Sequence, residues 1–134
     1  MQIEVIDWYN RKLVIDNPDK IFIFGENEEK QGKKERGAGQ AIIRDLPNTF
    51  GFRTKKSVYE YWSDENYSHN IICIEADIER LLKLSKNHIL VFPKNGLGTG
   101  LSKLPLFAPK SFLYLSKRLL DVFGYNNLQN LKSE

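Results

Sequence analysis

The sequence has a single cysteine, no long apolar run and little net charge. With Cys73 alone among 134 residues, an internal disulfide is impossible, so nothing requires an oxidising compartment. The first residues, Met1 to Asp7, lack the basic start and apolar stretch of a secretory signal peptide, and no run is long enough to span a bilayer. We therefore expect a cytoplasmic protein that does not enter a membrane.

Clusters of metal-ligating or nucleophilic residues are also missing. The two histidines, His69 and His88, are not paired in sequence, and no cysteine–histidine cluster has metal-ligand spacing. Cys73 falls within an apolar helical stripe, where a cysteine typically packs as a small side chain. We expect no metal site and no cofactor, and a structural or exposed position for each histidine.

The residues that are present fit one globular domain over residues 1–134, with a polar tail from 126 to 134. Hydrophobic residues make up 41% and charged residues 28%, as in ordinary folded proteins, and there is no repeat, low-complexity tract or linker. The net charge is +3, and the densest basic segment is residues 30–36. Such a segment can be a solvated loop, attract nucleic acid or neutralise a small polyphosphate ligand.

Three segments predict strands. Residues 21–24 and 88–92 are continuous, β-favouring and unalternating, which is typical of central strands covered on both faces. Residues 51–56 alternate more and predict a strand nearer an edge of the sheet.

Helical periodicity fills the intervals between and after these strands. Residues 38–46 predict a helix that Pro47 closes, and residues 71–86 carry one apolar stripe. Residues 109–123 predict a long helix that Gly124 is placed to cap. Strands alternating with helices predict an α/β fold, a three-layer α/β/α sandwich around a mixed or mostly parallel sheet.

Two segments allow more than one interpretation. Residues 8–15 fit either a short amphipathic helix or an added strand. Residues 57–70 are rich in aromatic side chains, which fit either a surface flap or a packing lid, and packing is the simpler interpretation.

Both predicted central strands are followed by glycine-bearing turns. Gly25 to Asn27 follow the first strand and precede Gly-Ala-Gly at 37–39, while residues 96–100 follow the second. Ligands of open α/β sheets gather at the carboxyl ends of strands, and glycines there let backbone N–H groups and helix N-termini approach an anion. The two turns therefore predict a diphosphate site, although neither contains the triphosphate-loop or dinucleotide motif.

The expected ligand-binding residues lie in these two turns or directly beside them. They are Gly25, Asn27, Arg36, Gly37, Ala38, Gly39, Gln40, Lys94, Asn95, Gly96, Leu97, Gly98, Thr99, Gly100 and Leu101.

The same motifs, taken in order, resemble the ligand loops of macrodomains. Residues 21–27 (IFIFGEN), 37–41 (GAGQA) and 96–101 (GLGTGL) are most similar to an uncharacterised macrodomain-like family common in bacteriophages. The similarity covers roughly residues 8–124, most of the domain. It implies a macrodomain-like fold and an ADP-ribose-type ligand, with Asn27 at the distal ribose, 37–39 beside the ribose and diphosphate, and 96–101 around the phosphates.

The sequence departs from macrodomains in two places. The Gly-Asp-Ile/Val stretch whose aspartate reads the adenine amino group is absent, and Asp16 and Asp19 are either its stand-ins or ordinary turn residues. The further strand that macrodomains tend to carry after the second loop and its helix is not found, because the polar tail begins soon after Gly124.

Three functions from different classes follow. The first is binding of an ADP-ribose-containing, NAD-derived nucleotide; in the phage setting that the resemblance implies, this would sequester a host immune signal in the host cytoplasm. The second is an ADP-ribosyl hydrolase, in which Asn27 orients a water and Glu26 accepts its proton. The third is a nucleic-acid-binding accessory protein that uses residues 30–36 and Lys55, Lys56 and Lys94. We favour binding over turnover, and small-molecule ligands over nucleic acid.

Overall fold

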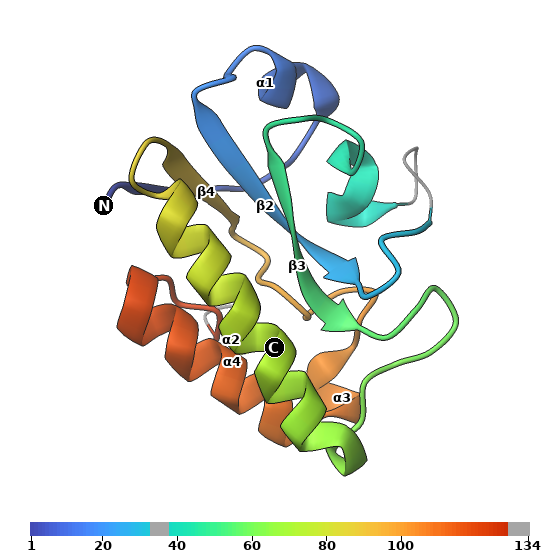
Figure 1. The fold of residues 1–134 in the computed structure, drawn as a ribbon. Helices are drawn as coiled ribbons and strands as arrows, with labels where there is room; N and C mark the ends of the chain where they lie inside the picture. Colours follow the sequence, from blue (N-terminus) through green and yellow to red (C-terminus); the bar gives the residue numbers. More distant parts are fainter. Residues whose placement is uncertain (33–37, 129–134) are drawn as a thin grey trace.

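Four parallel strands form the sheet of the computed structural model, which describes residues 1–32 and 38–128 (Figure 1). The strands are β1 (Ile3–Ile6), β2 (Lys20–Asn27), β3 (Thr49–Lys55) and β4 (Ile89–Pro93), in the order β1-β4-β2-β3. The two predicted central strands and the predicted edge strand are confirmed as β4, β2 and β3. Of the two sheet types expected, the mixed one is wrong for the described residues and the parallel one holds, since every pairing there is parallel. The short edge strand β1 was not predicted.

Helical segments connect the strands. They are α1 (Arg11–Ile15), the 3-10 helix η1 (Gly39–Ile43), the 3-10 helix η2 (Asp64–Asn66), α2 (Tyr67–Leu84), α3 (Leu104–Phe107) and α4 (Pro109–Phe123). The two long helices were predicted, α2 beginning four residues earlier than expected, and Gly124 caps α4 with a φ of +72°. None of the described helices is long and apolar enough to cross a membrane.

The predicted helix at residues 38–46 is wrong, because the chain forms only the five-residue 3-10 helix η1 there. Gly39 at its start has a φ of +63°, outside the α-helical region, and Pro47 follows too soon for a long helix. Residues 8–15, for which two interpretations were open, contain the short helix α1, capped by the Asn10 side chain, which accepts the Leu13 N–H at 2.8 Å.

The sheet is covered on both faces. Along β2, Ile21 and Ile23 pack in the core on the side of α2 and α4, whereas Phe22 and Phe24 pack on the side of α1 and η1. All four side chains are buried, which explains the unalternating apolar run in the sequence.

The order of the strands explains which helix covers which face. The connection from β1 to β2 passes β4 in one direction along the sheet, and that from β3 to β4 passes β2 in the other. Because parallel crossovers are right-handed, connections in opposite directions lie on opposite faces, as α1 and α2 do. The chain therefore leaves the carboxyl ends of β2 and β4 toward opposite faces. The region between these two strand ends, called the crevice below, is the place where α/β proteins typically bind ligands.

The aromatic segment 57–70 is divided between core and surface. Trp62 is 3% exposed and packs in the core below α2, which fits the packing interpretation, whereas Tyr59 is 92% exposed. Tyr61 stacks on Phe107 of α3 with ring centroids 4.5 Å apart. The segment thus packs through some of its rings and exposes others.

Candidate functional site

The crevice begins where β2 and β4 separate. The two strands pair only as far as Phe22 and Val91, after which β2 continues beside β3 alone. The hydroxyl of Tyr9 lies at this separation, 2.6 Å from the Ile23 carbonyl and 2.9 Å from the Val91 carbonyl. Burial raises the pKa of Tyr9 well above its ordinary value, so the hydroxyl remains a neutral donor that fixes the base of the crevice.

Gln40 joins the two sides of the crevice. Its side-chain oxygen accepts the Gly25 N–H at 3.0 Å, and its side-chain nitrogen donates to the Gly96 carbonyl at 2.8 Å. The two glycine-bearing turns, distant in sequence, are therefore brought together as predicted. Gly25 and Gly98 also approach closely, since a Cβ on Gly25 would lie 3.8 Å from the Gly98 nitrogen.

The second turn owes its shape to two glycines with positive φ. Gly96 has a φ of +91° and Gly98 a φ of +81°, a conformation that side-chain-bearing residues rarely adopt. A Cβ on Gly98 would also lie 2.5 Å from the Leu104 side chain. Asn127 fixes the residue between them by accepting the Leu97 N–H at 2.7 Å and donating to the Leu97 carbonyl at 3.1 Å.

A run of unused backbone donors follows in this turn. The N–H groups from Gly98 to Ser102 have no acceptor among the described residues, whereas those of Lys103 and Leu104 donate to the Gly100 and Gly98 carbonyls. Gly98 is buried. Buried N–H groups are nearly always paired, and successive N–H groups in a turn are the arrangement with which proteins bind anions. The second turn therefore has backbone donors available to an oxyanion, of which the Gly98 N–H is the buried one.

Helix dipoles add little to this site. The first turn leads into a five-residue 3-10 helix and the second into the four-residue α3. The predicted contribution from helix N-termini therefore does not apply. The N–H groups of the second turn are the remaining feature that an anion could use.

The two residues considered for catalysis are engaged in structural contacts. Both oxygens of the Glu26 carboxylate accept from Arg44, at 2.7 Å each, and one also accepts the Asn27 N–H. The Asn27 side chain donates to the Gln31 carbonyl at 2.6 Å and accepts the Glu29 N–H at 3.0 Å. Both side chains are buried and hold the loop after β2 in place.

The remaining predicted ligand residues lie in several different settings. Lys94 forms an exposed ion pair with Asp7 at 3.3 Å, and the Thr99 hydroxyl donates to the Asn95 carbonyl. Ala38 and Leu97 are buried, whereas Gly100 and Leu101 are exposed. Arg36 and Gly37 lie outside the described residues.

Two polar contacts near the crevice were not predicted. The Thr54 hydroxyl lies 2.7 Å from that of Ser102, which attaches the second turn to the end of β3. The fold also brings Glu28, next in sequence after β2, against His69 and Cys73 on α2. In the sequence, His69 and Cys73 are four residues apart, which places them on one face of a helix. This signal was missed because the helix was predicted to begin only at residue 71, after His69. Burial raises the pKa of the Cys73 thiol.

Comparison with known proteins identifies a family. The sequence model of the family described as "Family of unknown function (DUF7831)" matches residues 4–118. No curated protein and no solved structure matches the chain.

Proposed function

We propose that this chain, which belongs to the family of unknown function DUF7831, binds the diphosphate of an ADP-ribose-type nucleotide in the crevice between β2 and β4. The observation that carries the proposal is the run of N–H groups from Gly98 to Ser102 without acceptors among the described residues. Phosphate oxygens are strong acceptors, and several N–H groups can share one phosphate.

The position of these donors supports the same ligand class. They lie at the carboxyl ends of two neighbouring strands whose connections diverge, where α/β folds bind nucleotides. The Gly25 backbone has no side chain to block the approach, and Gln40 holds it beside the second turn. The resemblance of these turns to macrodomain loops adds the ADP-ribose identity to the diphosphate.

Binding without turnover fits the site better than hydrolysis. A general base needs a carboxylate that can accept a proton from water, but Glu26 is held by Arg44 on both oxygens. Asn27 has its amide in contacts within its own loop. The proposed role is therefore to hold, and so to sequester, the nucleotide.

Gly100 offers a clean test. Its φ is not positive, and a Cβ there would have no neighbour within 4 Å, so a side chain is tolerated without disturbing the turn. Gly100→Glu places a carboxylate among the free N–H groups, and Gly100→Gln places a neutral side chain of the same size. We expect Gly100→Glu to weaken ADP-ribose binding by at least about tenfold, and Gly100→Gln by less than about threefold.

Calorimetry with ADP-ribose, NAD and ADP, followed by chromatography of each recovered ligand, measures both binding and turnover. Intact ligand is the expected product. Equal affinities for the two Gly100 variants would exclude the second turn as the phosphate site. Recovery of a product in place of the ligand would instead mean that the protein is a hydrolase.

A further inference from the structure

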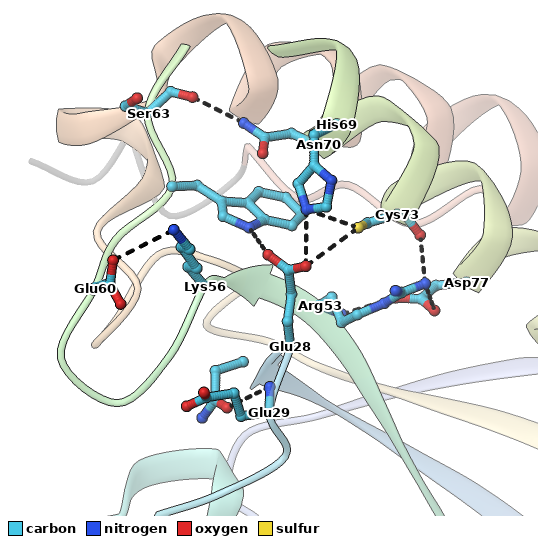
Figure 2. A network of polar contacts seen from close by, with 12 residues as sticks. Glu28, Glu29, Arg53, Lys56, Glu60, Ser63, His69, Asn70, Cys73 and Asp77 are labelled. Carbon is cyan, nitrogen blue, oxygen red and sulfur yellow. Dashed lines mark hydrogen bonds and ion pairs between the residues drawn. The ribbon is translucent and has the colours of Figure 1, made fainter. Parts of the chain in front are cut away.

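The second polar cluster at this edge of the sheet consists of Glu28, His69 and Cys73. Figure 2 shows the Glu28 side chain pointing from the end of β2 toward His69 and Cys73 on α2. The nearest distances are 2.8 Å from Glu28 Oε1 to His69 Nε2, 3.9 Å from Glu28 Oε1 to Cys73 Sγ, and 3.6 Å from Cys73 Sγ to His69 Nε2. One carboxylate oxygen, one imidazole nitrogen and one sulfur thus converge.

These distances are close to those between the ligands of one zinc ion. Zinc–nitrogen and zinc–oxygen bonds of about 2.0 to 2.1 Å and a zinc–sulfur bond of about 2.3 Å, at tetrahedral angles, separate the ligand atoms by about 3.3 to 3.6 Å. The two distances to sulfur fit this range to within about 0.4 Å. The Glu28–His69 distance must lengthen by about 0.5 Å, which His69 can accommodate because its side chain is 54% exposed.

We propose that Glu28, His69 and Cys73 form a zinc site in which solvent occupies the fourth position. Thiolate, imidazole and carboxylate are all common zinc ligands, and three protein ligands with one open position is a common zinc arrangement. The exposure of His69 gives an ion access from solvent, while Cys73, at 3% exposed, forms the inner wall of the site.

Outer contacts hold the ligands in these positions. The Trp62 indole N–H donates to Glu28 Oε2 at 3.0 Å, which leaves Oε1 directed at the other two ligands. The Glu28 N–H donates to the Lys55 carbonyl at 2.9 Å, and one helical turn fixes the spacing of His69 and Cys73. Such second contacts orient ligands and typically strengthen metal binding by 10- to 100-fold.

The positive charge of Arg53, which lies close to Cys73, is compensated. Arg53 donates to the Cys73 carbonyl at 3.3 Å, but its guanidinium also contacts both oxygens of the buried Asp77, at 3.0 and 3.1 Å (Figure 2). Its charge is therefore largely neutralised by Asp77 and opposes a zinc ion only weakly.

The alternative is that Glu28 and His69 form a simple ion pair beside a packed thiol. This arrangement accounts for the 2.8 Å contact without a metal. The two interpretations differ in metal affinity and in whether sulfur is a ligand, so both can be separated by experiment.

The test uses tag-free protein that has been dialysed against a chelator and then titrated with zinc chloride alone. We expect one zinc ion per chain. His69→Ala and Cys73→Ala should each weaken zinc binding by at least about tenfold. His88→Ala is the matched control, because His88 lies beyond the C-terminal end of α2, with its Nδ1 3.1 Å from the Leu84 carbonyl, and it should leave zinc affinity unchanged.

Cobalt gives a second readout that does not depend on affinity. A cobalt ion bound by Cys73 would show the charge-transfer absorption of a thiolate ligand, and Cys73→Ala would lose it. Failure to bind zinc at one ion per chain, equal losses for His69→Ala and His88→Ala, or a cobalt spectrum without the thiolate band would each overturn the proposal. Because none of these residues lies in the glycine-bearing turns, nucleotide binding is measured separately from this result.

Discussion

Arg44 and Glu26 form a buried two-point ion pair at the end of β2. The Arg44 Nε and Nη2 atoms donate to the two Glu26 oxygens at 2.7 Å each, and the two side chains are 11% and 2% exposed. The pair joins the end of the strand to the residue that follows η1. It therefore fixes the β2 side of the crevice.

Replacement of Arg44 by methionine should destabilise the protein strongly. The buried Glu26 carboxylate would lose its partner, which typically costs about 3 to 5 kcal/mol. Arg11→Met is the matched control, because the side chains of the Arg11–Asp45 pair are 38% and 36% exposed, and we expect a loss of at most about 1 kcal/mol there. Chemical denaturation of both variants measures the difference.

The double variant Glu26→Gln/Arg44→Met separates an unpaired charge from lost packing. It should be more stable than Arg44→Met alone, since no carboxylate is left without a partner. If the double variant were less stable than the single one, the ion pair would not be the reason for the loss.

Asn27→Ala should weaken ADP-ribose and ADP binding by the same factor. The Asn27 amide holds Glu29 and Gln31, so its removal loosens the loop whichever nucleotide is bound. A direct bond to the distal ribose, as the macrodomain resemblance implies, would instead affect only ADP-ribose, which carries that sugar. Dissociation constants of both nucleotides for wild type and variant decide between the two roles. If only ADP-ribose binding became weaker, a direct contact between Asn27 and the distal ribose would be supported instead.

Gln40→Met should loosen the crevice without emptying the core. Methionine has nearly the same length but can neither accept the Gly25 N–H nor donate to the Gly96 carbonyl. We expect the Gly25 amide to exchange with solvent about tenfold faster, which corresponds to one lost hydrogen bond of about 1.4 kcal/mol. The Phe22 amide, which donates to the Asn48 carbonyl, is the internal reference and should be unchanged. Unaltered exchange at Gly25 would mean that Gln40 does not couple the turns.

Much of the fold could be predicted from local patterns. Continuous apolar runs identified β2 and β4, because both faces of these strands are buried. Apolar stripes at helical spacing identified α2 and α4, because one face of each helix is buried. Strand β1 has only four residues, IEVI, which are too few to show either pattern. Glycines after the predicted strands singled out the two turns that Gln40 joins in the structure.

The chemistry of individual side chains was harder to predict, because it depends on partners far away in the sequence. Nothing near Glu26 indicates that Arg44 will neutralise it, and nothing near Glu28 indicates His69 and Cys73. Similarly, Gly98 fits an anion-binding turn, but its contact with Leu104 shows a packing requirement as well. A glycine pattern alone does not separate these two causes.

Asp64 allows a pH-dependent prediction. Its carboxylate accepts the Lys110 and Ser111 N–H groups, at 2.9 and 3.0 Å, and so caps the start of α4 from a distant part of the chain. Partial burial raises the pKa of Asp64, but these N–H groups and the Ser111 hydroxyl lower it more, so the net pKa lies below its ordinary value. A carboxyl group with a lowered pKa in the folded state stabilises the protein above its unfolded-state pKa of about 3.9, and this contribution is lost as the pH falls through the folded pKa.

Asp64→Asn should therefore lower the free energy of unfolding at pH 7 by about 1 kcal/mol, the typical value of a helix cap. The difference from wild type should shrink below about pH 4 and vanish once the carboxyl group is protonated in the folded state too, because the wild type then also lacks the charge. Glu65→Gln is the control: Glu65 is exposed and makes no polar contact among the described residues, so it should change stability by less than about 0.5 kcal/mol at either pH. Urea denaturation of the three proteins at pH 7 and pH 3 provides the measurement. A deficit for Asp64→Asn that is as large at pH 3 as at pH 7 would show that the side chain acts through packing and not through its charge.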